Sequence, residues 1–198
     1  MAPWQGPAPS LRGVGGNGDL SVRIRARRSD DVPLLAQVLL AQQSLTRYPF
    51  RNPLPMPVER FLHADDARDA WTAEADGRPV GHVCRLGPPR GYPEAEAMND
   101  ACARAHGCAV DDLGWVATLF VDPAVRGLGV GRALLRTAVT GIGRAGLRPC
   151  LEVLPVHAAA LAMYESDGWR EVLRVRPAWL RAAAGDEVPD VRVLVLAG

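Results

Sequence analysis

Lysine is absent from this chain of 198 residues, and all 23 of its basic residues are arginines. No lysine side chain is therefore available to clamp a phosphate, to form a Schiff base or to be acetylated by the protein itself. The 22 acidic residues leave a formal net charge of +1. This even balance argues against nucleic acid or an anionic membrane surface as a partner.

Long hydrophobic runs are missing too. No stretch reaches the roughly 18 apolar residues of a membrane span, and Met1–Gly18 lacks the apolar core of a signal peptide. The four cysteines do not form a disulfide framework. Cys102, His106 and Cys108 lie close together, but no second ligand pair follows at zinc-site spacing, so we expect no metal. These features favour a reducing, cytoplasmic compartment.

The composition, 48% hydrophobic and 23% charged, is ordinary for a globular protein with a core. Residues 1–19 are rich in glycine and proline and are expected to form a disordered tail. Residues 20–198 are expected to form a single domain, with a helical insertion at about 88–113, after the Pro- and Gly-rich turn that follows a strand.

Hydrophobic periodicity predicts a mixed α/β layer with helices on both faces of the sheet. The expected strands are Leu20–Arg25, Ala70–Ala75, Pro79–Leu86, Trp115–Val121, Leu151–Leu154, Trp169–Val175 and Val191–Leu196. The expected helices begin near Val32 and cover Val58–Ala67, Glu94–His106, Gly129–Val139 and His157–Ser166. Asp76-Gly77 indicates a hairpin, and Gly141, Gly143 and Gly146 are expected to end their helix.

A glycine-rich turn joins the strand that ends at Val121 to the helix that follows Gly129. The first turn of a helix has unpaired N–H groups and the positive end of the helix dipole, so it can bind a phosphate. Arg126 and Arg132 can add charge. A Walker loop needs lysine, and a dinucleotide fingerprint needs glycine where Leu134 stands. From the glycines alone, a pyrophosphate site and a turn without a ligand are equally acceptable.

Arg126-x-x-Gly129-x-Gly131 resembles the acetyl-CoA signature, Q/R-x-x-G-x-G/A, of the GCN5-related N-acetyltransferase (GNAT) family. The resemblance covers most of the chain after Leu20. It implies an α+β fold with a mostly antiparallel sheet of six to seven strands, acetyl-CoA as cosubstrate and no metal. It also implies that the backbone of Leu119, Phe120 and Val121 holds the pantetheine arm and thioester. The pyrophosphate would lie on Arg126, Gly127, Leu128, Gly129, Val130, Gly131 and Arg132.

The segment Leu151–Trp169 resembles the second half of the family pattern, and its spacing is similar to that of bacterial N-terminal alanine acetyltransferases of ribosomal proteins. This implies that Tyr164 contacts the CoA sulfur and protonates the leaving thiolate. The alternative is a tyrosine that only packs on its helix. His157 stands where the family has asparagine, which implies a contact with the cosubstrate. Neutral histidine can donate once and accept once, so that contact differs.

Glu152 is the best candidate for a general base. A single carboxylate in an apolar strand is costly to bury without a partner, and burial raises its pKa into the range useful for accepting an amine proton. The alternative is a glutamate at an edge, paired with one of the many arginines. The strand Trp115–Val121 has no acid, and Asp111, Asp112 or a chain of waters also stay open as bases.

We therefore expect direct transfer of an acetyl group to a primary amine of a small molecule or a peptide N-terminus, with an amide near Leu119 or Phe120 holding the oxyanion. The alternative is a non-catalytic acyl-CoA-binding or sensing domain. A covalent cysteine route is disfavoured, because no cysteine stands in a recognisable nucleophile motif beside a histidine. The site that binds the acceptor would be formed by the segments Ser44–Pro57, Gly87–Leu113 and Pro177–Pro189. The sequence leaves a homodimer open.

Overall fold

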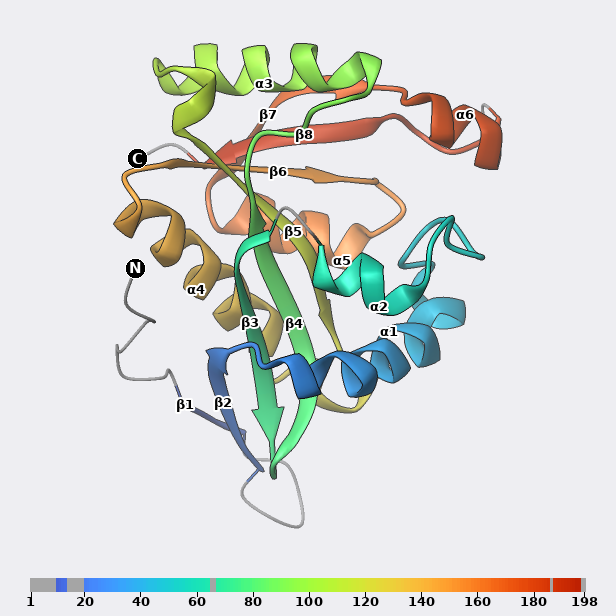
Figure 1. The fold of residues 1–198 in the computed structure, drawn as a ribbon, viewed down its shortest axis with the longest axis vertical. Coiled ribbons are helices and arrows are strands. Elements are labelled where there is room, and N and C mark those ends of the chain that lie inside the picture. The colour runs from blue at the N-terminus through green and yellow to red at the C-terminus, as the bar shows by residue number, and fades with distance from the viewer. Residues whose placement is uncertain (1–9, 14–19, 65–66, 186, 197–198) are drawn as a thin grey trace.

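The computed structural model describes residues 10–13, 20–64, 67–185 and 187–196. Its strands form one sheet in the order β1-β2-β3-β4-β5-β6-β8-β7 (Figure 1). The strands are β1 (Ser10–Gly13), β2 (Leu20–Ala26), β3 (Ala67–Ala75), β4 (Arg78–Leu86), β5 (Leu113–Val121), β6 (Arg148–Val153), β7 (Trp169–Val175) and β8 (Val191–Leu196). Neighbouring strands are antiparallel except β5 and β6, which are parallel.

This arrangement confirms the mixed, mostly antiparallel sheet. It has eight strands rather than six to seven, because Ser10–Gly13 pairs with β2 and is not part of a disordered tail. Residues 1–9 and 14–19 of the expected tail lie outside the described residues. The hairpin at Asp76-Gly77 joins β3 to β4 as expected, with both residues at positive φ.

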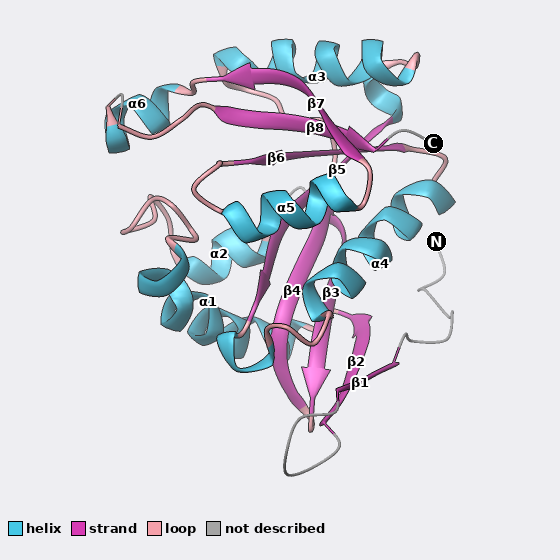
Figure 2. Ribbon diagram, turned by 180° about the vertical axis from the view of Figure 1, so that it is seen from behind, coloured by secondary structure: helices cyan, strands magenta, loops and turns pink. Residues whose placement is uncertain are grey.

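Helices cover both faces of the sheet, as predicted. They are α1 (Val32–Thr46), α2 (Val58–His63), α3 (Pro93–His106), α4 (Val130–Arg144), α5 (Ala158–Ser166) and α6 (Ala178–Ala184). α1, α2 and α3 lie on one face, and α4 and α5 lie on the other (Figures 1 and 2). α6 forms within a segment expected to be a loop. No helix in the described part of the chain is both long and apolar enough to cross a membrane.

The main core lies between the sheet and α4. Leu134, Ala138 and Ile142 recur at helical spacing and are buried. α4 continues to Arg144, so Gly141 and Gly143 lie within it, whereas Gly146, at a φ of +76°, follows its end as expected. A Cβ at Gly141 would come within 2.8 Å of the ring of Trp71 on β3. The glycine is therefore explained by close packing of the helix on the sheet, which a sequence pattern does not show.

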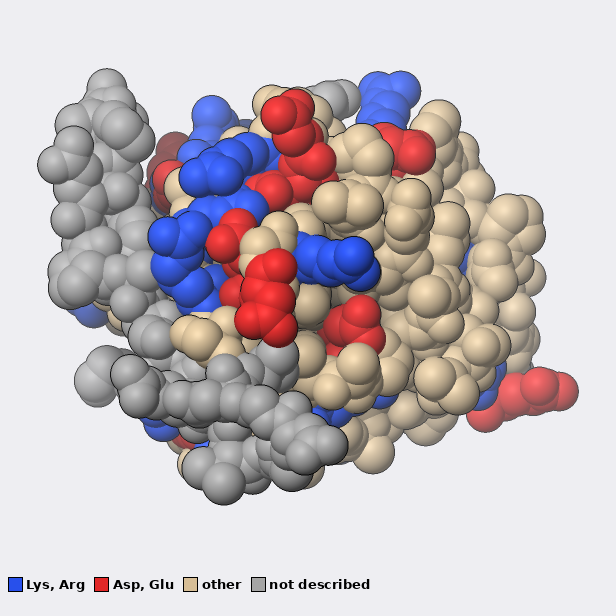
Figure 3. Space-filling model, turned by 90° about the horizontal axis from the view of Figure 1, so that it is seen from below, with Lys and Arg blue, Asp and Glu red and all other residues tan. Residues whose placement is uncertain are grey.

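Acidic and basic side chains mingle on the face of the molecule seen from below (Figure 3). Arg25 pairs with both Asp31 and Glu74, and Arg23 pairs with Glu74. The described part of this face therefore carries no extended patch of one sign, in keeping with the net charge of +1.

Candidate functional site

The glycine-rich turn between β5 and α4 forms an open cradle. Gly127 and Gly129 adopt φ values of +79° and +78°, which side chains with a Cβ rarely adopt. Apart from the glycine and its two chain neighbours, no atom of the described residues lies within 4 Å of where a Cβ of either glycine would stand. The first helical bond runs from the N–H of Ala133 to the carbonyl of Gly129, at 3.0 Å. The N–H groups of Val130 and Gly131 are thus left without helical acceptors, and they can receive an anion.

The two arginines of this loop are held by protein groups. The Arg126 guanidinium donates to Oε1 of Gln42 on α1 at 2.5 Å and to the carbonyl of Val121 at 3.4 Å. The Arg132 guanidinium donates to Oγ of Ser166 at 2.7 Å and lies 3.1 Å from a carboxylate oxygen of Asp167. In this arrangement the cradle consists mainly of backbone N–H groups.

The parallel strands β5 and β6 separate beside this cradle. Their pairing runs from Leu113 beside Arg148 to Val116 beside Leu151 and then stops. β5 continues through Ala117–Val121, paired only with β4 on its other edge. Each strand carries N–H and C=O groups on both edges, so this part of β5 presents backbone groups without a strand partner to the opening. The opening suits an extended ligand with amide groups.

A β-bulge changes the direction of β5 at this opening. His82 pairs with Phe120 and Cys84 pairs with Ala117, so two residues of β5, Thr118 and Leu119, face one residue of β4. Thr118 has a φ of +53°. A β-branched residue rarely adopts this conformation, and such strain costs about 1–3 kcal/mol and persists only where the surroundings enforce it. The bulge re-aims the backbone amides that follow it.

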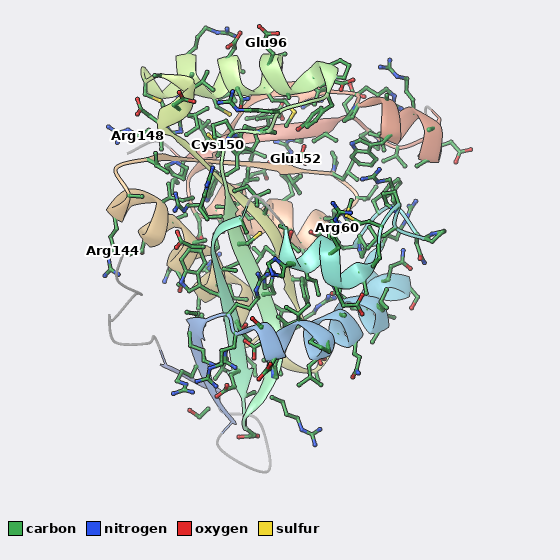
Figure 4. The ribbon with its side chains drawn as sticks, in the orientation of Figure 1. Arg60, Glu96, Arg144, Arg148, Cys150 and Glu152 are labelled. Atoms are coloured by element: carbon green, nitrogen blue, oxygen red, sulfur yellow. The ribbon has the colours of Figure 1, made fainter. Side chains whose placement is uncertain are left out.

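Glu152 lies on β6 just beyond the point of separation, with α2 and its Arg60 below it in the view of Figure 4. The residue is exposed to solvent, yet many protein atoms lie around its carboxyl group. This desolvation raises the pKa of the Glu152 carboxyl. No hydrogen bond or ion pair joins it to another described residue, so the alternative of an arginine-paired glutamate finds no partner there.

Two tyrosines have raised pKa values. Tyr164 on α5 is buried, with its ring 6.0 Å from that of Trp169, and burial raises its pKa. Tyr48 follows α1, and burial raises its pKa too, with smaller contributions from Tyr164 and Glu152. Tyr48 belongs to Ser44–Pro57, one of the segments that the sequence suggests as part of the acceptor-binding site.

Comparison with known proteins assigns the chain to a family. The sequence profile of the Acetyltransferase (GNAT) family matches residues 38–169. The chain belongs to this family. Mycothiol acetyltransferase from Acidothermus cellulolyticus is 36% identical over 107 residues, which span 50% of this chain but only 29% of that protein. The chain therefore spans less than a third of the length of this GNAT relative.

Solved structures share the GNAT fold at low sequence identity. The ribosomal-protein-S18-alanine N-acetyltransferase of Escherichia coli has a TM-score of 0.59 and 19% identity, with 88% of this chain and 92% of that chain covered. The yncA structure from Salmonella typhimurium, determined with its cofactor acetyl-CoA, has a TM-score of 0.62 and 17% identity, with 89% and 93% covered. At these identities the likeness establishes the fold alone.

His157, where the family pattern has asparagine, precedes α5 and faces α1. Its Nδ1 lies 3.2 Å from the carbonyl of Thr46, and the Tyr48 ring meets its ring edge-on at 5.6 Å. Burial lowers the pKa of His157, and the nearby Arg47 adds to this effect. The residue thus links α5 to the end of α1, beside the opening.

The three segments expected to shape the acceptor meet around the opening. Phe50 of the loop after α1 packs against Trp179 of α6, with ring centroids 6.3 Å apart. Arg51 lies over the Trp179 ring at 5.3 Å. Tyr92, just before α3, has its pKa raised by burial and by the charges of Glu152 and Glu94. These contacts come from residues far apart in the chain.

The other candidate bases lie elsewhere. Asp111 and Asp112 precede β5, whereas the opening lies at the other end of that strand. Asp111 pairs with Arg90 at 3.0 Å and lines a hollow of about 470 Å³ there, and Asp112 accepts from the N–H of Ala109 at 3.2 Å. Among the described residues, no three His, Cys, Asp or Glu side chains form a group that could hold a metal.

Proposed function

We propose that the protein transfers the acetyl group of acetyl-CoA to a primary amine, on a small molecule or a peptide N-terminus, by direct attack within a ternary complex. One observation carries this proposal above the others. The free edge of β5 leads from the glycine cradle to an opening where Glu152 has a raised pKa and no described partner. Bound acetyl-CoA would supply a thioester, whose carbonyl carbon the amine attacks.

Glu152 activates the acceptor in this proposal. An alkyl amine is mostly protonated at neutral pH, so a proton must leave before or during attack. The Glu152 carboxylate accepts that proton directly or through one water. Its raised pKa makes it a stronger base than an ordinary glutamate, because general bases work best with a pKa near the operating pH.

The backbone of β5 and the Tyr164 hydroxyl stabilise the charges that develop. An amide of Leu119 or Phe120 donates to the thioester oxygen, and Tyr164 donates to the departing sulfur. A free thiol titrates near 8.5 and a phenol near 10, so full proton transfer is uphill by roughly 2 kcal/mol. Burial of Tyr164 raises its pKa further. It therefore acts mainly as a hydrogen-bond donor, with proton transfer late.

The rival function is a non-catalytic acyl-CoA-binding or sensing domain, which would use the cradle alone. Glu152 favours the enzyme over the sensor. A desolvated carboxylate without a partner is costly, and it does not help the glycine-rich loop after β5 to bind acyl-CoA. Release of the CoA thiol should be measured with acetyl-CoA and a panel of amino acids, polyamines, aminoglycosides and peptides. We expect release that depends on at least one amine. Tight acetyl-CoA binding with no amine-dependent release would favour the sensor.

Acetyl-CoA binding itself is tested at Gly129. Gly129→Glu places a Cβ and a carboxylate in the cradle, and we expect isothermal titration to show affinity at least about tenfold weaker, or 1.4 kcal/mol. Gly143→Glu is the matched control, since Gly143 is an exposed glycine of the same helix with open space around it. It should bind as the wild type does. Unchanged affinity in a folded Gly129→Glu variant would remove the cradle from the proposal.

A further inference from the structure

The strained bulge of β5 is held from β4 by a fully buried histidine. Nδ1 of His82 lies 3.0 Å from the carbonyl oxygen of Thr118, the residue at positive φ. The His82 ring also lies against the Phe120 ring, with centroids 5.7 Å apart and planes tilted by 32°. The histidine therefore contacts both the strained residue and the strand that continues from it.

The partners of His82 determine where its proton lies. Its Nε2 is 3.2 Å from a guanidinium nitrogen of Arg27. A guanidinium only donates, so Nε2 must accept. The ring proton then lies on Nδ1 and is donated to Thr118. Burial, with a smaller effect of Arg27, lowers the pKa of His82 to about 4, so the ring stays neutral at neutral pH.

Arg27 is anchored in turn to α2. Its guanidinium donates to the carbonyl of Leu62 and, at 3.2 Å, to that of His63. Both carbonyls belong to the end of a helix, where backbone acceptors lack helical partners. A continuous chain of hydrogen bonds therefore runs from α2 through Arg27 and His82 to the bulge.

We propose that His82 is a positioning residue for acetyl transfer. Its Nδ1–H holds the Thr118 carbonyl, so that the amides following the bulge point at the thioester oxygen. Arg27 fixes the His82 tautomer that makes this bond. The inference rests on the proposed function, because it assigns those amides to the reacting carbonyl. It predicts that loss of the His82 bond lowers turnover more than acetyl-CoA affinity, since the cradle at the other end of the ligand is untouched.

Two substitutions separate the two bonds of His82. His82→Asn places an amide nitrogen near the position of Nδ1 and can still donate to Thr118. His82→Gln places an amide oxygen near the position of Nε2 and keeps an acceptor for Arg27, but loses the bond to Thr118. We expect kcat to fall at least about thirtyfold in His82→Gln and to stay within about fivefold in His82→Asn, because small misplacements of catalytic groups have large effects on rate. Acetyl-CoA affinity should change less than about twofold in both. Equal losses of kcat, or none in His82→Gln, would overturn the proposal.

The same substitutions at His106 are the matched control, because its Nε2 also meets a backbone carbonyl, that of Pro149, at 3.1 Å. His106 lies on α3 away from the opening, so neither substitution should lower kcat.

Two spectroscopic readouts work without knowledge of the acceptor. The carbonyl stretch of bound acetyl-CoA labelled with ¹³C should shift to lower frequency on binding, and His82→Gln but not His82→Asn should reverse the shift. ¹⁵N NMR of the wild type should show His82 protonated at Nδ1, and a proton on Nε2 would overturn the proposal even if both variants fail to fold. If acetyl-CoA binds and is polarised but no amine is acetylated, the proposed function fails and the role of His82 in orienting the amides stands.

Discussion

The pKa values of two carboxylates shift in opposite directions. Asp31 lies between β2, β3 and α1, and Glu152 lies in the opening of the sheet. Asp31 is buried, and its oxygens accept from the Arg25 guanidinium at 2.6 and 2.8 Å, from the Arg28 N–H at 2.8 Å and from the Thr72 hydroxyl at 3.0 Å. Burial alone would raise the pKa of Asp31, but these bonds together lower it. Glu152 has no described partner, and desolvation raises its pKa.

The difference separates a carboxylate that stabilises the fold from one that is available to a ligand. Both oxygens of Asp31 accept hydrogen bonds from protein groups, four bonds in all, and the residue is buried away from any substrate. Glu152 is solvent-accessible, and with no partner among the described residues its charge can be compensated by an incoming cation or proton. The two residues should therefore respond to the loss of charge in opposite ways.

The largest effect is expected at Asp31. Asp31→Asn leaves Arg25 facing an amide, and breaking such a buried pair should reduce the free energy of unfolding by about 3 kcal/mol. Asp30→Asn, at an exposed neighbour, is the control and should stay within about 0.5 kcal/mol. Urea unfolding followed by circular dichroism measures both. Equal stability of the two variants would mean that the Asp31 network contributes nothing.

The pH dependence of the same measurement has a definite sign. Because the folded pKa of Asp31 is lowered, its contribution is fully present above its unfolded pKa of about 3.9 and is lost as pH falls through the folded value. The stability difference between wild type and Asp31→Asn should therefore narrow in acid below about pH 4. A difference that stays constant there would contradict a lowered pKa.

Glu152 should show a smaller effect, in rate and not in stability. Glu152→Gln should lower turnover roughly a hundredfold, the low end of acid–base contributions, and remove the acidic limb of the kcat/KM profile. In the wild type that limb falls as pH drops through the raised pKa, because the base must be deprotonated. Melting temperature should not fall, since an unpaired, desolvated carboxylate is destabilising above its unfolded pKa.

Glu96→Gln is the matched control for Glu152, because Glu96 is an exposed glutamate on α3, away from the opening (Figure 4). It should leave both rate and stability as they are. An unaltered acidic limb together with a lower melting temperature in Glu152→Gln would remove Glu152 from the mechanism and give it the same role as Asp31.

A substitution of Tyr164 tests whether a raised pKa by itself identifies a catalytic residue. We expect the smallest effect on turnover here. Tyr164→Phe keeps the ring against Trp169 and removes only the hydroxyl. We expect kcat to fall about tenfold, below the usual range for a complete acid–base role, because the hydroxyl donates a hydrogen bond and transfers its proton late. Acetyl-CoA affinity should be nearly unchanged. Wild-type turnover, where chemistry limits the rate, would leave Tyr164 as a packing residue.

Much of the conformation of the glycine-rich loop could be predicted from the sequence, because its determinants are local. The strand before Val121, the glycines at 127 and 129 and the helix from Val130 occur in one short segment. Their conformations follow from hydrophobic spacing and from the ability of glycine to adopt positive φ. The helix α6 and the strand Ser10–Gly13 were not predicted, since they depend on packing and pairing with distant segments.

By itself, the sequence determined the alternation of strands and helices, the hairpin at Asp76-Gly77 and the cradle at the start of α4, each through the backbone preferences of neighbouring residues. Tertiary structure alone decided that Glu152 has no hydrogen-bond or ion-pair partner among the described residues, that the ring of Tyr48 meets that of His157, and that a histidine on the neighbouring strand meets the carbonyl of Thr118, the residue at positive φ. Desolvation and strain depend on groups brought together from distant parts of the chain, and no local pattern records which groups those will be.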